Sequence, residues 1–234
     1  MKKYFYLPIL ALTVLIISCT NEQDSCDPLA NTWVKENMSV IKSMTRSTWL
    51  KLDESEPIKR AAFVALSPEK QRLFWEDKIT EVVEQFEWTD QEMEHLNLLL
   101  NFIKKTDIFY KDEVDENFEI FVYQWNDYAL NELKWTKKLI FSIAASGDKL
   151  INKDGGVLES TKDELTNNHI ASDPENPGYS VCTCSQRSDF CDPFNDIPDW
   201  VLNCNSYNYN CNNVPGCGLL WQFTCDGICK SPIG

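Results

Sequence analysis

The sequence predicts a mainly α protein, with an N-terminal helical bundle followed by a small, disulfide-rich and loop-rich C-terminal module. Two observations predict this division. Between residues 27 and 165 apolar side chains recur at helical spacing. The ten cysteines are unevenly placed, with none between Cys26 and Cys182 and eight from Cys182 to Cys229. Because such a shift separates differently stabilised modules, we expect a helical domain over 27–165, a linker over 166–179 and a disulfide-rich module over 180–234.

Residues 1–18 are typical of a secretory signal peptide. Lys2 and Lys3 supply a positive start, and Leu7–Ile17 is an apolar run too short to span a bilayer as a stable helix. The end of this run, Ile16-Ile17-Ser18-Cys19, resembles the lipobox of bacterial lipoproteins. The alternative is an ordinary signal peptide with an incidental cysteine.

The lipobox resemblance implies that Cys19 carries the lipid and that residues 19–26 form a tether to the membrane. Glu22 and Asp24 are similar to the short acidic stretch that sends some lipoproteins to the cell surface. We therefore expect a cell-envelope protein at the outer membrane or cell surface. Its formal charge is −14, or −16 without Lys2 and Lys3, which argues against nucleic acid as a partner.

The helical domain contains two helices with clear start signals. Ser67 followed by Pro68 is typical of an N-cap with proline at the first helical position, and Thr89 with Glu92 forms a capping box. The first helix carries the apolar stripe Trp75, Ile79, Val82, Val83 and Phe86, and the second carries Met93, Leu96, Leu99, Leu100 and Ile103.

Further helices are expected on both sides of this pair. A stretch over 115–145 has apolar residues at helical spacing and predicts one long helix that ends at Ser146-Gly147. Weaker patterns predict helices over 29–52 and 58–66, and one helical turn over 161–165. Each apolar stripe is either a ligand-binding or membrane-lying face or plain core, and the bundle favours core.

The helical domain offers no recognisable catalytic or cofactor-binding pattern. Its histidine, His95, and the later His169 do not form a paired zinc motif, and Glu92 with His95 lacks the second copy that a di-iron bundle needs. No phosphate loop, nucleophile elbow or dinucleotide fingerprint is present. We expect His95 at the surface, no cofactor and no enzymatic activity.

The C-terminal module predicts a disulfide framework. Its eight cysteines lie within fewer than 50 residues of an exported chain that cannot bury a large core, so cross-links must supply stability. Two zinc ions are the alternative, but paired C-x2-C knuckles are absent. The asparagine-rich sequence and the Pro215-Gly216 turn favour loops. The cysteines expected in disulfides are Cys182, Cys184, Cys191, Cys204, Cys211, Cys217, Cys225 and Cys229.

The same module resembles the disulfide-rich bacteriocin fulvocin C and its related lipoproteins. The resemblance rests on the run Cys182-Thr183-Cys184-Ser185-Gln186-Arg187-Ser188-Asp189-Phe190-Cys191, followed by Cys211, Gly216-Cys217-Gly218, Trp221, Cys225 and Gly227. It covers about residues 180–229 and implies an antibacterial peptide. This chain departs from the family because here the module ends a lipid-anchored protein.

Three functions follow from these patterns. The first is a bacteriocin-like toxin precursor that is cut near 172–179, and the second is a surface-displayed lipoprotein whose disulfide knot binds a cell-surface or host molecule. An extracytoplasmic enzyme is the third and has least support. In the second function, exposed Trp200, Tyr207, Tyr209 and Trp221 are the expected contacts, although both tryptophans suit a small core equally well.

The module's net charge of −3, from five acids against Arg187 and Lys230, favours a protein or cell-wall receptor over anionic lipid.

Overall fold

The computed structural model describes residues 24–25, 27–158, 172–173, 176–180, 184–185, 187–188, 204–205 and 214–229. For 172–173, 176–180, 204–205 and 228–229 only the backbone is described. Several expectations therefore lie outside the described residues: the signal peptide, the turn over 161–165, and the side chains of Cys19, Cys26, Cys182, Cys191, Cys204, Cys211, Cys229, Trp200, Tyr207 and Tyr209.

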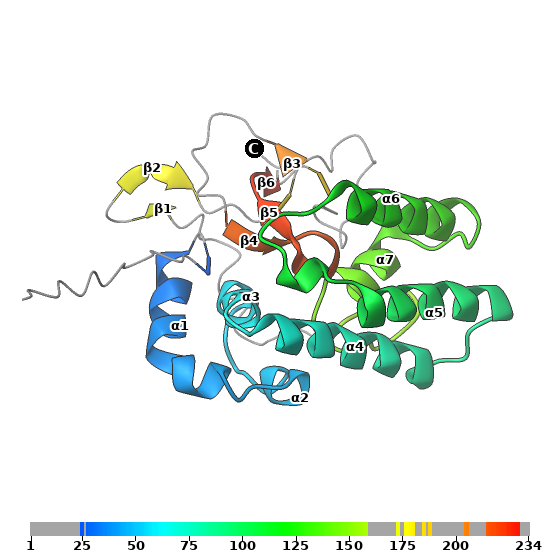
Figure 1. Ribbon diagram of the computed structural model, residues 1–234, viewed down its shortest axis with the longest axis horizontal. Helices are drawn as coiled ribbons and strands as arrows, with labels where there is room; N and C mark the ends of the chain where they lie inside the picture. The colour runs from blue at the N-terminus through cyan, green and yellow to red at the C-terminus, as the bar shows by residue number, and fades with distance from the viewer. Residues whose placement is uncertain are drawn as a thin grey trace, which may run out of the picture.

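The described chain is mainly helical, as predicted (Figure 1). Its α-helices are α1 (Pro28–Ile41), α2 (Arg46–Trp49), α3 (Glu56–Val64), α4 (Pro68–Gln85), α5 (Asp90–Lys105), α6 (Glu116–Asn131) and α7 (Lys137–Ala144), with 3-10 helices η1 (Ile108–Tyr110) and η2 (Leu219–Trp221). Its strands are β1 (Ser172–Asp173), β2 (Asn176–Ser180), β3 (Cys204–Asn205), β4 (Val214–Cys217), β5 (Phe223–Cys225) and β6 (Ile228–Cys229). The strands form three antiparallel pairs, β1-β2, β3-β6 and β4-β5.

The start of α5 confirms the predicted capping box. The Thr89 hydroxyl accepts a hydrogen bond from the Glu92 amide at 3.3 Å, and the Glu92 carboxylate accepts one from the Thr89 amide at 2.9 Å. At the start of α4, Ser67 has the extended backbone of an N-cap and Pro68 takes the first helical position, but the serine side chain makes no capping hydrogen bond. Proline at that position is sufficient for the start because it removes one unsatisfied amide.

The prediction of a single helix over 115–145 is wrong. The chain forms α6 and α7 instead, separated by Lys134 at φ 58° and restarted by Thr136, whose hydroxyl accepts from the Leu139 amide at 3.1 Å. The break turns Trp135 inward, where its indole N–H donates to Glu92 at 3.0 Å. The range 29–52, predicted as one helix, likewise forms two helices, because a Thr45–Thr48 capping box starts α2 separately from α1.

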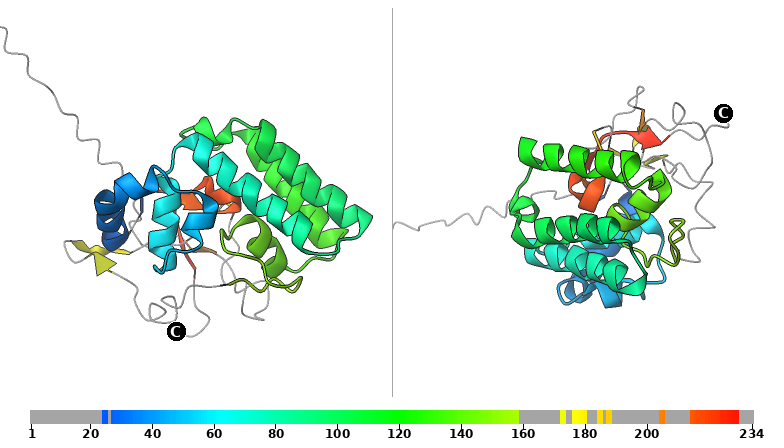
Figure 2. Two further views of the ribbon diagram at one scale, coloured as in Figure 1. Left: turned by 90° about the horizontal axis from the view of Figure 1, so that it is seen from below. Right: turned by 90° about the vertical axis from the view of Figure 1, so that its right-hand side faces the viewer.

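One hydrophobic core joins the helices to the C-terminal segment. Its members come from α1 through α7 and also include Leu219, Leu220, Trp221 and Phe223. In Figure 1 and in both views of Figure 2, the orange and red β4-η2-β5 segment lies among the helices, and β4 packs against α3. Among the described residues, no helix is both long and apolar enough to cross a membrane.

Candidate functional site

The predicted disulfide chemistry is present in the described part of the C-terminal module. Cys217 and Cys225 form a disulfide across the β4-β5 pair, and Cys184 is also disulfide-bonded. Cys184 and Gly227 form a backbone bridge, with hydrogen bonds of 3.2 and 3.0 Å. In the β3-β6 pair, Cys204 and Cys229 are direct backbone partners.

The loop closed by this disulfide carries Trp221 into the helical core. Trp221 is only 2% exposed. Its ring centroid lies 4.9 Å from that of Phe63, and its indole N–H donates to the Ala145 carbonyl at 2.9 Å. The other rings around it belong to Trp49, Phe74 and Trp75, at 5.7, 5.9 and 5.4 Å. The prediction of Trp221 as an exposed contact residue is therefore wrong, and the core it fills belongs to the helices.

The backbone of η2 is shaped to make this insertion. Leu220 and Trp221 both have positive φ, 55° and 54°, a conformation that non-glycine residues adopt only when surrounding packing holds them there. Gly218 precedes them at φ 68°, where glycine is favoured. The tertiary contacts of Trp221 with the helices therefore stabilise a turn that its local sequence does not favour.

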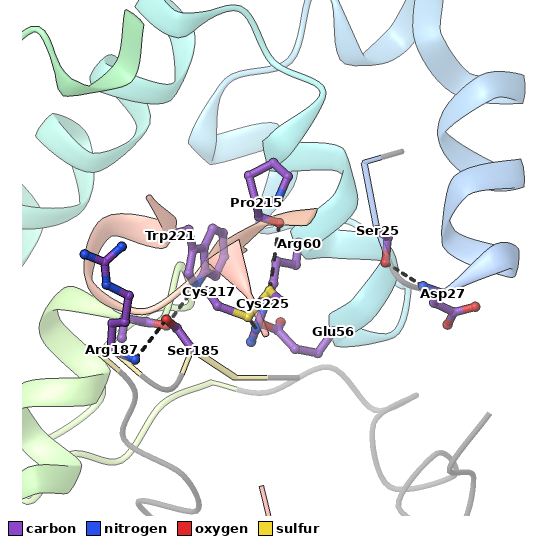
Figure 3. Close-up of a disulfide and its surroundings, with 11 residues drawn as sticks. Ser25, Asp27, Glu56, Arg60, Ser185, Arg187, Pro215, Cys217, Trp221 and Cys225 are labelled. Carbon is purple, nitrogen blue, oxygen red and sulfur yellow. Dashed lines mark hydrogen bonds and ion pairs between the residues drawn. A yellow bond between two sulfur atoms is a disulfide. The ribbon is translucent and has the colours of Figure 1, made fainter. Parts of the chain in front are cut away.

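Arg60 of α3 links the disulfide to the helices. Its guanidinium carbon lies 5.7 Å from the centre of the Trp221 ring, a cation–π contact, and its Nη1 lies 3.6 Å from Cys217 Sγ. Its Nη2 donates to Glu56 at 3.2 Å, one helical turn earlier (Figure 3). One arginine therefore contacts both the disulfide and the tryptophan.

A second attachment joins the cysteine-rich module to α6. Arg187 forms an ion pair with Glu119. The hydroxyl of Ser188 accepts from the Leu219 amide at 3.3 Å, which ties this segment to η2. The C-terminal segment is therefore held by contacts with α3 and α6 as well as by its insertion into the core.

Buried charges fix the loop that receives Trp221. Lys59 forms an ion pair with Asp148 at 2.5 Å, Lys78 donates to the Asp148 carbonyl, and Arg46 donates to the Gly147 carbonyl at 3.1 Å. Desolvation by burial, together with the nearby positive charge of Arg46, lowers the pKa of Lys78 to about 7. A Cβ at Gly147 would lie 2.8 Å from atoms of three surrounding aromatic rings, so glycine is required for the loop to approach them.

His95 is buried, and the prediction of a surface position is wrong. It is 4% exposed, and its ring stacks on Trp125 at 4.7 Å and on Tyr128 at 5.0 Å. Desolvation lowers the pKa of His95 to about 4, so it is neutral at physiological pH. Within the described residues no group of three or more histidines, cysteines and acidic residues is placed to hold a metal ion.

Several residues of this site were not identified from the sequence. They are Arg60, Gly147 and the helical partners of Trp221. The available signal was the apolar run Leu219-Leu220-Trp221 beside Gly218, which is more apolar than an exposed disulfide loop requires.

Comparisons with known proteins place this chain in no family: no family model matches it, and neither a curated protein nor a solved structure does. The similarity to fulvocin C remains a prediction from the cysteine motif.

Proposed function

We propose that this chain is an exported lipoprotein, anchored in the cell envelope through Cys19, whose cysteine-rich C-terminal module is displayed on a helical bundle and binds a receptor without catalysis. The observation that carries the proposal is the position of Trp221, which lies in the core of the helices although it comes from the disulfide-bonded segment. The module is then a fixed part of the anchored protein.

Release of the module as a toxin would require these contacts to be broken. Leu219, Leu220, Trp221 and Phe223 are each at most 2% exposed. Full burial of one such side chain is worth about 1.5 to 3 kcal/mol, so a cut in the linker leaves a strong noncovalent attachment. Dissociation would also expose this apolar surface to water on both parts.

We assign the receptor contacts to Trp200, Tyr207 and Tyr209, because aromatic side chains provide large contact areas with few rotatable bonds. The negative charge of the module favours a protein or cell-wall receptor, and the lipid anchor supplies the membrane attachment.

The first experiment tests whether the module stays attached. The chain is produced oxidised and without residues 1–26, and a protease site is placed within 159–171. Because every remaining cysteine lies after that site, no disulfide can join the two fragments. We expect the cut fragments to elute together in size exclusion under native conditions, and the Trp221→Ala chain, cut in the same way, to separate.

The second experiment tests what the module does. The labelled intact protein is applied to panels of bacterial and host cells, beside the Trp200→Ala, Tyr207→Ala and Tyr209→Ala triple variant. We expect saturable binding that the triple variant loses without a change in unfolding midpoint. The competing candidate is the bacteriocin-like toxin, which the cysteine motif favours. Spontaneous release of an oxidised C-terminal fragment that clears bacterial lawns would replace our proposal with that one.

A further inference from the structure

A pocket lies between α5 and α6, and all the residues that line it belong to these two helices. Its volume is about 370 Å³, within the range of small-molecule sites. The side chains that line it project from facing stripes of the two helices: Gln91, Glu94, His95 and Leu98 from α5, and Phe121, Gln124, Trp125 and Tyr128 from α6. Spacings of three and four residues place each set on one helix face.

His95, which lines this pocket, adds no positive charge to it. Its ring is 4% exposed and stacks on Trp125 at 4.7 Å and on Tyr128 at 5.0 Å. Because desolvation lowers the pKa of His95 to about 4, the ring is neutral at physiological pH. A neutral ring does not repel a positively charged ligand.

The rest of the pocket favours a positively charged, partly apolar ligand. Phe121, Trp125 and Tyr128 supply aromatic surface, which attracts cations as well as apolar groups. Glu94 lies at the exposed rim and forms no ion pair within the described chain, while no lysine or arginine is among the described residues that line the pocket. The formal charge of −14 adds a long-range attraction for cations.

We propose that this pocket binds a small organic ammonium ion. The ammonium group pairs with the Glu94 carboxylate, and its apolar part lies against Leu98, Phe121 and Trp125. This proposal does not depend on the receptor contacts proposed for the cysteine-rich module.

The test is isothermal titration of the oxidised chain lacking residues 1–26 with three probes that share one ring and differ in charge. Phenethylammonium is the cation, 2-phenylethanol its neutral counterpart and 3-phenylpropionate an anion. We expect measurable binding of the cation, at least tenfold weaker binding of the alcohol and none of the anion. Equal binding of cation and alcohol, preference for the anion, or no binding of the cation at millimolar concentration would each overturn the proposal.

Two variants assign the binding to the pocket. Glu94→Gln retains the shape of the side chain and removes its charge, and should weaken cation binding about tenfold while leaving the alcohol unchanged. Glu36→Gln makes the same change at an exposed position on α1 and should have no effect. If Glu94→Gln and Glu36→Gln bind the cation equally well, the proposed site is wrong.

Discussion

Replacing Trp221 with alanine measures how strongly the C-terminal segment is tied to the helices. Removal of a fully buried tryptophan typically costs about 3 to 5 kcal/mol, because the lost apolar contacts leave a cavity. The Ala145 carbonyl also loses its 2.9 Å hydrogen bond from the indole and is left unsatisfied, at about 1 kcal/mol. We therefore expect Trp221→Ala to lower the free energy of unfolding by at least about 4 kcal/mol, a large part of the stability of an ordinary domain.

Guanidinium unfolding followed at 222 nm by circular dichroism is the appropriate assay, because that signal reports the helices. A loss of about 4 kcal/mol should move the midpoint down by roughly 1 M for a protein of this size. Trp221→Phe retains an aromatic ring without the N–H group and should fall between alanine and the wild type.

The matched control is Tyr123→Ala on α6. Tyr123 is also aromatic but is 72% exposed, so its loss should change stability by less than about 0.5 kcal/mol. If the helices of Trp221→Ala unfolded at the wild-type midpoint, Trp221 would not belong to their core. The argument that the module is fixed to the helices would then fail with it.

Three further predictions concern the surroundings of this core and the start of α5. The pKa of Lys78 in the folded state, about 7, lies below the ordinary lysine value of 10.5, so the folded state binds fewer protons than the unfolded state between these pH values. Denaturation at pH 6, 8 and 10 should show stability rising with pH in the wild type, while Lys78→Met should lack that rise. Gly147→Ala should lower stability by about 1 to 3 kcal/mol in thermal unfolding, because its methyl group would collide with three rings. Thr89→Ala should cost about 1 kcal/mol through loss of the cap on the Glu92 amide, and an unchanged midpoint would show that the capping box contributes nothing.

The parts of the fold that the sequence predicted correctly are those set by local interactions. Helix α5 is the clearest case, since Thr89 and Glu92 mark its start and four of the five apolar residues predicted on its stripe, all except Met93, are buried. Capping and helical periodicity act within a few residues, so they are visible in the sequence. The break after α6 was missed because apolar residues continue through Trp135, and only Thr136 marked a new start.

The parts that the sequence did not predict depend on contacts between distant segments. His95 was assigned to the surface because no metal-binding motif accounted for it, yet rings from α6 and Trp135 bury it. Trp221 was expected either as an exposed contact of the disulfide knot or in the small core of that knot, yet its partners lie on α2, α3 and α4. Periodicity and cysteine spacing identify which residues are buried or cross-linked within one segment, but not which segment fills the core of another.

The position of Trp221 between two bonded cysteines connects oxidation of the chain to completion of its helical core. The Cys217–Cys225 disulfide closes a short loop with a sequence separation of 8, and η2 lies inside that loop. Closing such a loop reduces the entropy of the unfolded chain and stabilises the folded state by about 2 to 3 kcal/mol. Part of this stabilisation offsets the cost of forming the positive-φ turn at Leu220 and Trp221. Since Trp49 lies near one end of the chain and Trp221 near the other, their shared core forms only after nearly the whole chain is present. The chain therefore reaches full stability where disulfides form, which agrees with the proposed export of the protein, and its β4-η2-β5 segment is then held in the helical core.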